Sequence, residues 1–191
     1  MGAIGLAFGG LPWCDVANAN AQEPPAESLH NEYDLKAVFL YTFGRYIEWP
    51  ATAFANASAP FVIGVVGEDS FAGALDTIAK KKTIQRRRIV IRRFTSPADY
   101  AQPCQILFVS RSLTAEQRAA VLAKTQKESV FVVGEVSGFA EQGAMANFVV
   151  EGDRVRFEIN VDAARRAQLR MDAKLLSLGI PVSGVKAAYS N

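Results

Sequence analysis

The residue types that most often carry catalysis are sparse in this chain. It has 191 residues with one histidine, His30, and two cysteines, Cys14 and Cys104. A cysteine nucleophile needs a nearby group that lowers its pKa, and His30 lies in the N-terminal segment, far from Cys104 in the sequence. No HExxH, CxxC or GxSxG motif occurs. The sequence therefore predicts no enzyme and no metal site, and it predicts that Cys104 is a small buried side chain.

Carboxylates gather after the first apolar strand, where Gly67 is followed by Glu68, Asp69 and Ser70, with Asp76 further along. A strand, a glycine turn and a helix start can together cradle a phosphate. However, neither GxGxxG nor GxxxxGK[ST] is complete here, and the two carboxylates would repel an anion. We therefore predict no cofactor, and an ordinary strand–helix connection in which Asp69 or Ser70 caps the helix. The three carboxylates could also meet in one crevice, although their spacing does not require it.

The densest basic stretch spans residues 80–93, with Lys80–Lys82 and Arg86–Arg88 before a short apolar strand and Arg92 and Arg93 after it. Such a run could contact an anionic membrane surface, an acidic partner or nucleic acid. No aromatic side chain alternates with these charges, and the net charge of the chain is only +2. We therefore predict a solvated helix end and edge strand, and no nucleic-acid binding.

Residues 154–167 predict a strand that runs directly into a helix. Apolar side chains alternate there with polar ones, as in a half-buried strand. The apolar set is Val155, Phe157, Ile159 and Val161, and the polar set is Arg154, Arg156, Glu158 and Asn160. Asp162 follows in the position of an N-cap, and the apolar spacing of later residues predicts one helix that ends at Gly179.

The elements before this stretch alternate between strand and helix. An aromatic-rich helix, predicted to be mostly buried over 29–48, is followed by apolar strands at 61–66, 89–91, 104–110 and 129–133. Thr114 and Gln117 form a capping-box pattern at the start of a further helix, and residues 145–161 read as a hairpin. The predicted fold class is α/β: a single-domain sandwich with a mostly parallel sheet, flanking helices and a C-terminal β-hairpin.

The two ends of the chain differ from the domain between them. Residues 1–21 resemble an export signal, because an apolar stretch precedes two small-x-small patterns, Ala17-Asn18-Ala19 and Ala19-Asn20-Ala21. Residues 22–28 read as a linker, 29–179 as the domain and 180–191 as a flexible tail. Removal of the signal would take away Cys14, so the mature chain could form no internal disulfide. No apolar run is long enough to cross a bilayer.

Several separated blocks, in order, resemble the YfiR family. They are residues 36–43 (KAVFLYTF), 48–50 (EWP), 104–110 (CQILFVS), 138–140 (GFA), 145–148 (MANF), 154–160 (RVRFEIN), 163–167 (AARRA) and 174–176 (KLL). The match runs in order from about Tyr33 to Leu178, which is nearly the whole of the mature chain. The sequence departs from the family in having one mature cysteine, where some members carry disulfides, and in the run 143–147, where the family tends to a Gly-Gly-Met-Ile type.

The resemblance implies a periplasmic regulator without enzymatic activity. Its expected partner is a membrane diguanylate cyclase or a similar membrane sensor, which it represses by binding the periplasmic region. The resemblance also implies an outer-membrane lipoprotein that relieves repression, and a homodimer. The polar face of residues 154–160 becomes a candidate partner surface, with intramolecular salt bridges as the alternative. A small-ligand binding domain, or an enzyme with an unrecognised site at the carboxyl ends of the strands, is the other hypothesis.

Overall fold

The structure is a computed structural model, and it describes residues 26–152 and 154–183. The predicted export signal, most of the predicted linker and residues 184–191 of the predicted tail lie outside these ranges. The helices are α1 (Ala26–Tyr46), α2 (Ala74–Lys81), α3 (Ala115–Thr125), α4 (Val161–Arg166) and α5 (Ala173–Leu178), with short 3-10 helices η1 (Ala51–Ala53) and η2 (Pro97–Asp99). The strands are β1 (Ile47–Glu48), β2 (Phe61–Val66), β3 (Thr83–Ile84), β4 (Arg87–Phe94), β5 (Ile106–Val109), β6 (Phe131–Gly134), β7 (Ala146–Glu151), β8 (Arg154–Ile159), β9 (Arg170–Met171) and β10 (Ile180–Pro181).

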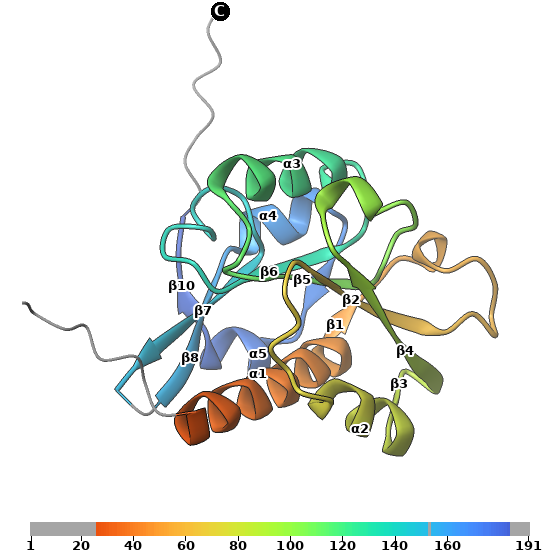
Figure 1. The fold of residues 1–191 in the computed structure, drawn as a ribbon. Coiled ribbons are helices and arrows are strands. Elements are labelled where there is room, and N and C mark those ends of the chain that lie inside the picture. The colour runs from red at the N-terminus through yellow and green to blue at the C-terminus, as the bar shows by residue number, and fades with distance from the viewer. Residues whose placement is uncertain (1–25, 153, 184–191) are drawn as a thin grey trace, which may run out of the picture.

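Eight strands form one mostly parallel sheet in the order β10-β8-β7-β6-β5-β2-β4-β3. The strands β4, β2, β5, β6 and β7 are parallel to their neighbours in that series. The strands β7 and β8 form the predicted antiparallel hairpin, with Phe148 opposite Phe157. The predicted fold class is therefore confirmed. Figure 1 shows α3 on one side of the sheet and α1, α2 and α5 on the other.

The core is split between the two faces of the sheet because the central strands are apolar on both sides. All six residues of β2 and all four of β5 and of β6 are buried, as expected of strands covered by helices on both faces. On the α1 side, the ring of Phe43 packs edge-on against Phe131 and Phe157 and stacks on Phe148. This aromatic cluster fixes α1 across the middle of the sheet.

The helix α1 buries most of its apolar side chains. Tyr33, Ala37 and Leu40 are buried as predicted, but Leu35 and Val38 are 39% and 53% exposed. The prediction of a mostly buried helix is therefore confirmed except at Leu35 and Val38, because Phe43 is fully buried and Phe39 packs against the core. The reason for these two exceptions is geometric, since α1 lies on the outside of the sheet and no described element covers its far side (Figure 1).

The predicted helix over 162–179 is broken by a strand. The helix α4 ends at Arg166, Gln168 takes a left-handed φ of 61°, and β9 then pairs with β1. Asp172 starts α5 by accepting a hydrogen bond from the amide of Lys174 at 2.8 Å. The apolar residues of this region keep a helical spacing, which is why the sequence predicted one helix. In the structure, however, the backbone of Arg170 and Met171 pairs with β1, and a continuous helix could not make that pairing.

Two further boundaries differ from the predictions. The helix α2 begins after Gly73 and not after Asp69 or Ser70, because Asp69 accepts a hydrogen bond from the amide of Phe71 and forms a turn before the helix. At the other end, Ile180 and Pro181 fall within the predicted tail yet pair with β8 as β10. The capping box of Thr114 and Gln117 on α3 is confirmed.

Candidate functional site

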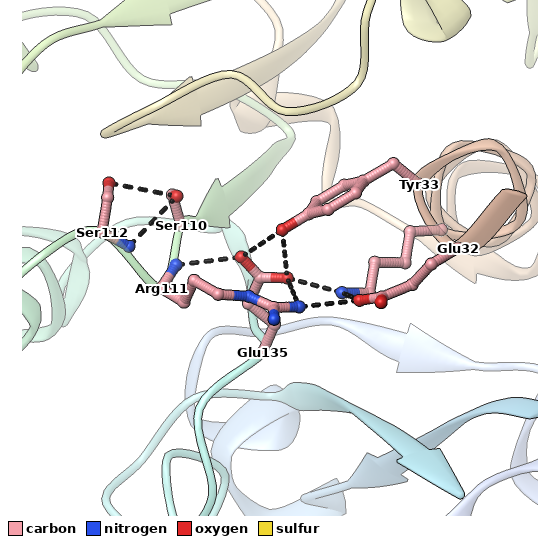
Figure 2. A network of polar contacts seen from close by, with 7 residues as sticks. Glu32, Tyr33, Ser110, Arg111, Ser112 and Glu135 are labelled. Carbon is pink, nitrogen blue, oxygen red and sulfur yellow. Dashed lines mark hydrogen bonds and ion pairs between the residues drawn. The ribbon is translucent and has the colours of Figure 1, made fainter. Parts of the chain in front are cut away.

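A buried ion network lies at the carboxyl ends of β5 and β6, where α1 crosses them (Figure 2). Glu135 follows β6, Arg111 follows β5, and Glu32, Tyr33 and Lys36 come from α1. The ammonium of Lys36 lies 2.5 Å from Glu135 Oε2 and also contacts Glu32. Arg111 Nη2 lies 2.7 Å from Glu32 and 3.0 Å from Glu135. Two cations thus face two carboxylates.

The network is charged but shielded from water. The side chain of Lys36 is 0% exposed and that of Glu135 is 1% exposed, whereas Arg111 is half exposed and closes the network towards solvent. Burial alone would raise the pKa of Glu135, but the charge of Lys36 and the hydrogen bonds from Arg111 outweigh burial and hold that pKa below its ordinary value. Burial and the nearby charge of Glu135 raise the pKa of Tyr33 to about 12.

Both oxygens of Glu135 are already occupied. Oε1 accepts from the backbone amide of Arg111 at 2.9 Å, Oε2 accepts from Lys36, and the Tyr33 hydroxyl lies within 3.1 Å of both. A carboxylate with this many donors is a poor proton acceptor, because protonation would break the bonds that hold it. The arrangement is suited to anchoring α1 to the strand ends rather than to acid–base chemistry.

Sequence reasoning missed this network, although two signals pointed to it. Glu32 and Lys36 are four residues apart on a helix, and Lys36 shares its face with the buried residues Tyr33 and Leu40. A lysine on an apolar helix face requires a buried anionic partner. Glu135 comes directly after β6 and Arg111 comes two residues after the end of β5, so both side chains start from the same edge of the sheet.

The predicted polar face of β8 is present, and its residues differ in environment. Arg154 and Arg156 are exposed, while Phe157 and Ile159 are buried, which confirms the alternation. Arg156 lies 3.2 Å from Glu151 in a pair that is about half exposed. Glu158 is partly exposed and accepts a hydrogen bond from Asn147 at 3.0 Å.

Asn160, the fourth residue of that predicted surface, is 0% exposed. Its side-chain oxygen accepts from the amide of Ala163 at 2.9 Å, and its side-chain nitrogen donates to the carbonyl of Ala140 at 2.8 Å. Asn160 therefore takes the N-cap role that the sequence assigned to Asp162, which instead pairs with Arg165. Because its side chain is enclosed, Asn160 does not belong to the accessible part of the face.

The carboxylates near the end of β2 do approach one another. Arg93 lies 2.5 Å from Asp69 and 2.5 Å from Asp76, so one guanidinium joins two of the three predicted carboxylates. Glu68 lines a hollow of about 380 Å³ at the carboxyl ends of β2, β4 and β5, and the order of the parallel strands reverses between β2 and β5. The lining residues are Gly67, Glu68, Arg93, Phe94, Thr95, Ser112, Leu113 and Gln117.

Cys104 is buried, as predicted, with 1% of its surface exposed. Burial raises the pKa of its thiol to about 12, so the thiol stays protonated at neutral pH. Within residues 26–152 and 154–183, no group of three or more His, Cys, Asp or Glu side chains is placed to hold a metal ion. Over the same residues, no helix is both long and apolar enough to cross a membrane.

Comparison with known proteins shows which family the chain belongs to. No curated protein matches the chain. A conserved domain protein of known structure from Vibrio cholerae is 15% identical, over 63% of this chain and 54% of that one, with a TM-score of 0.48. This protein thus spans about half the length of that relative. A family model described as YfiR/HmsC-like matches residues 33–180, which is most of the chain and nearly all of its described part. The chain belongs to the YfiR/HmsC-like family.

Proposed function

We propose that this protein is a periplasmic regulator that binds and represses the sensor region of a membrane diguanylate cyclase, or of a similar membrane signalling protein. The observation that carries this proposal is the family match over residues 33–180. The Glu135 network agrees with it, because both oxygens of that carboxylate already accept hydrogen bonds and are suited to holding α1 in place.

The accessible face of β8 is the contact surface that we favour. Arg154 is exposed with no ion-pair partner among the described residues, and Arg156 has only the exposed pair with Glu151. Exposed pairs of this kind are weak and exchange readily for a partner's groups.

The wider proposal follows the family. The export segment at residues 1–21 would bring the protein to the periplasm, an outer-membrane lipoprotein would compete for it there, and the protein would form a homodimer. The exposed apolar stripe of Leu35 and Val38 on α1 is the surface we assign to the homodimer, because one helical turn separates the two side chains and both face solvent.

A capture experiment tests the regulator proposal. Tagged, exported protein is recovered from membranes, and the double variant Arg154→Glu/Arg156→Glu is compared with Arg165→Glu/Arg166→Glu, which makes the same charge change on α4. We expect the first variant to lose an inner-membrane signalling protein that the wild type and the α4 variant retain. If the wild type recovers no inner-membrane partner, the proposal is wrong. Retention of the partner by Glu158→Lys would remove Glu158 from the surface.

A small-ligand binding protein is the second candidate function, and the 380 Å³ hollow favours it. In open α/β sheets, ligands bind outside the carboxyl ends of the strands where the strand order reverses, and this hollow lies there. A thermal-shift screen with amino acids and nucleotides tests this candidate, because a ligand that binds only the folded state raises the melting temperature. A ligand whose effect disappears in Glu68→Gln would favour this function, and no shift with any compound would count against it.

A further inference from the structure

The outer edge of β4 is open over most of its length. The strand β3 pairs with only Arg87 and Arg88, whereas residues 89–94 pair on their inner side with β2 and on their outer side with no described strand. The amide of Gly67 donates to the carbonyl of Phe94 at 2.9 Å, which places the backbone groups of Phe94 on the β2 side. Because these groups alternate along a strand, the ones that point away from β2 belong to residues 89, 91 and 93.

Unpaired positive charges surround the start of this edge. Five exposed cations lie within α2, β4 and the segment that joins them, namely Lys80, Lys81, Lys82, Arg86 and Arg88. None of the five has an ion-pair partner in the part of the chain that the structure describes. The neighbouring arginines are different, because Arg87 donates to the carbonyl of Ala59 at 2.6 Å and Arg93 pairs with Asp69 and Asp76. The whole chain carries a net charge of only +2, so this end of the sheet is strongly basic relative to the rest.

The turn between β3 and β4 holds one of these cations in an unfavourable backbone conformation. Gln85 and Arg86 have φ values of 49° and 63°, a pair that favours Asn and Gly in two-residue hairpin turns. Gln85 fixes the turn by donating from its side chain to the carbonyl of Ile47 at 2.9 Å. Arg86 is exposed and makes no hydrogen bond or ion pair with any described residue, so no polar interaction within the described fold accounts for an arginine at this strained position.

We propose that the outer edge of β4 binds an extended acidic segment of a partner protein as an added strand. The N–H and C=O groups of residues 89, 91 and 93 would pair with the backbone of that segment, and its carboxylates would face the five cations. Pairing of two copies through this edge is disfavoured, because it would bring like charges together. An anionic membrane could neutralise the charges but would not use the open backbone groups, so the geometry favours a peptide strand.

This surface is separate from the one assigned to the membrane partner. The strands β3 and β4 lie at one end of the sheet and β8 lies near the other (Figure 1). A protein with both surfaces can hold two partners at once.

Amide hydrogen exchange tests the proposal directly. The probe is an eight-residue peptide of alternating Glu and Val with blocked ends, and the control peptide has Lys in place of Glu. We expect the acidic peptide to slow exchange of the amides of Ile89, Ile91 and Arg93 by about tenfold at saturation, whereas the amides of Val90 and Arg92, already bonded to β2, change little. The lysine peptide should have no effect.

A second experiment reverses the charge of two cations at this edge. In Arg86→Glu/Arg88→Glu, affinity for the acidic peptide should fall by about tenfold or more, while Arg154→Glu/Arg156→Glu, with the same charge change at β8, should bind normally. If the first variant does not fold, the affinity of the wild-type protein for the acidic peptide is measured at increasing salt concentration. Salt screens the same charges, so this affinity should fall. The proposal is wrong if the peptide fails to bind, if it protects other amides instead, or if vesicles containing phosphatidylglycerol bind the protein and the peptide does not.

Discussion

The carboxylate of Glu135 receives hydrogen bonds from the side chains of Tyr33, Lys36 and Arg111 and is almost fully enclosed. Removal of one charge from such a group leaves its partner charged and buried. We therefore expect Glu135→Gln to lower the free energy of unfolding by about 3–5 kcal/mol, measured by urea denaturation. The control is Glu151→Gln, which breaks an exposed pair and should cost about 0.2–1 kcal/mol.

A double-mutant cycle separates the pair from the packing around it. The cycle combines Glu135→Gln with Lys36→Met, which removes the buried ammonium. We expect the double variant to lose less stability than the sum of the two single variants. Each single substitution leaves the other side chain charged and buried without its partner, whereas the double variant removes both charges. Additive losses would show that the two side chains act independently and that the network is not coupled.

The same carboxylate makes stability depend on pH in a defined window. The pKa of Glu135 lies below its ordinary value of 4.5 in the folded state, so its contribution is fully present above that value and is lost as the pH falls through the lowered pKa. The difference in unfolding free energy between wild type and Glu135→Gln should be constant above about pH 5 and should shrink below it. A difference that stays constant down to the acid transition would contradict the assignment.

Cys104 should be unreactive in the folded protein. With a thiol pKa of about 12, the thiolate is on the order of 10⁻⁴ of the total at pH 8, and the side chain is also enclosed. In a chain with Cys14→Ser, we expect no measurable reaction with Ellman's reagent until denaturant is added, when the thiol should react within minutes. Rapid labelling of the native protein would show that the core opens around β5.

At the scale of elements, local capping decides where helices begin. Asn160 bonds to the amide of Ala163 and to the carbonyl of Ala140, so it starts α4 and also ties α4 to the loop after β6. Asn160→Ala should lower the free energy of unfolding by about 1–2 kcal/mol. Thr114→Ala, which removes only the cap of α3, should cost less because no second tie is lost. An unchanged unfolding midpoint in Asn160→Ala would contradict the structural role.

Elements with a strong local pattern could be predicted from the sequence, and elements fixed by distant contacts could not. The bounds of β2 were predicted to the residue because its apolar run stands between clear turn signals. The strand β9 was missed, since only its pairing with β1, far away in the sequence, makes it a strand. The Lys36–Glu135 contact was missed for the same reason, because 99 residues separate the two side chains.

At the scale of the whole molecule, the charged and apolar surfaces are spread over different parts of the fold. The open edge of β4 is at one end of the sheet, the polar face of β8 is near the other, and the apolar stripe of Leu35 and Val38 is on α1. This separation allows each surface to be changed without disturbing the others. It also means that effects of variants on dimerisation and on partner binding should be independent.

The proposed homodimer provides the sharpest test of that separation. Val38 is 53% exposed, so Val38→Lys removes little buried area within one chain and should leave the unfolding free energy of the monomer nearly unchanged. Within the proposed dimer the same change would bury a charge without a partner. Sedimentation velocity should show a wild-type dimer that Val38→Lys converts to a monomer. The matched control is Val150→Lys, at a residue of β7 that is 44% exposed, which should remain a dimer. A wild type that stays monomeric at about 50 µM, or a Val150→Lys variant that also dissociates, would exclude the α1 stripe as the dimer surface.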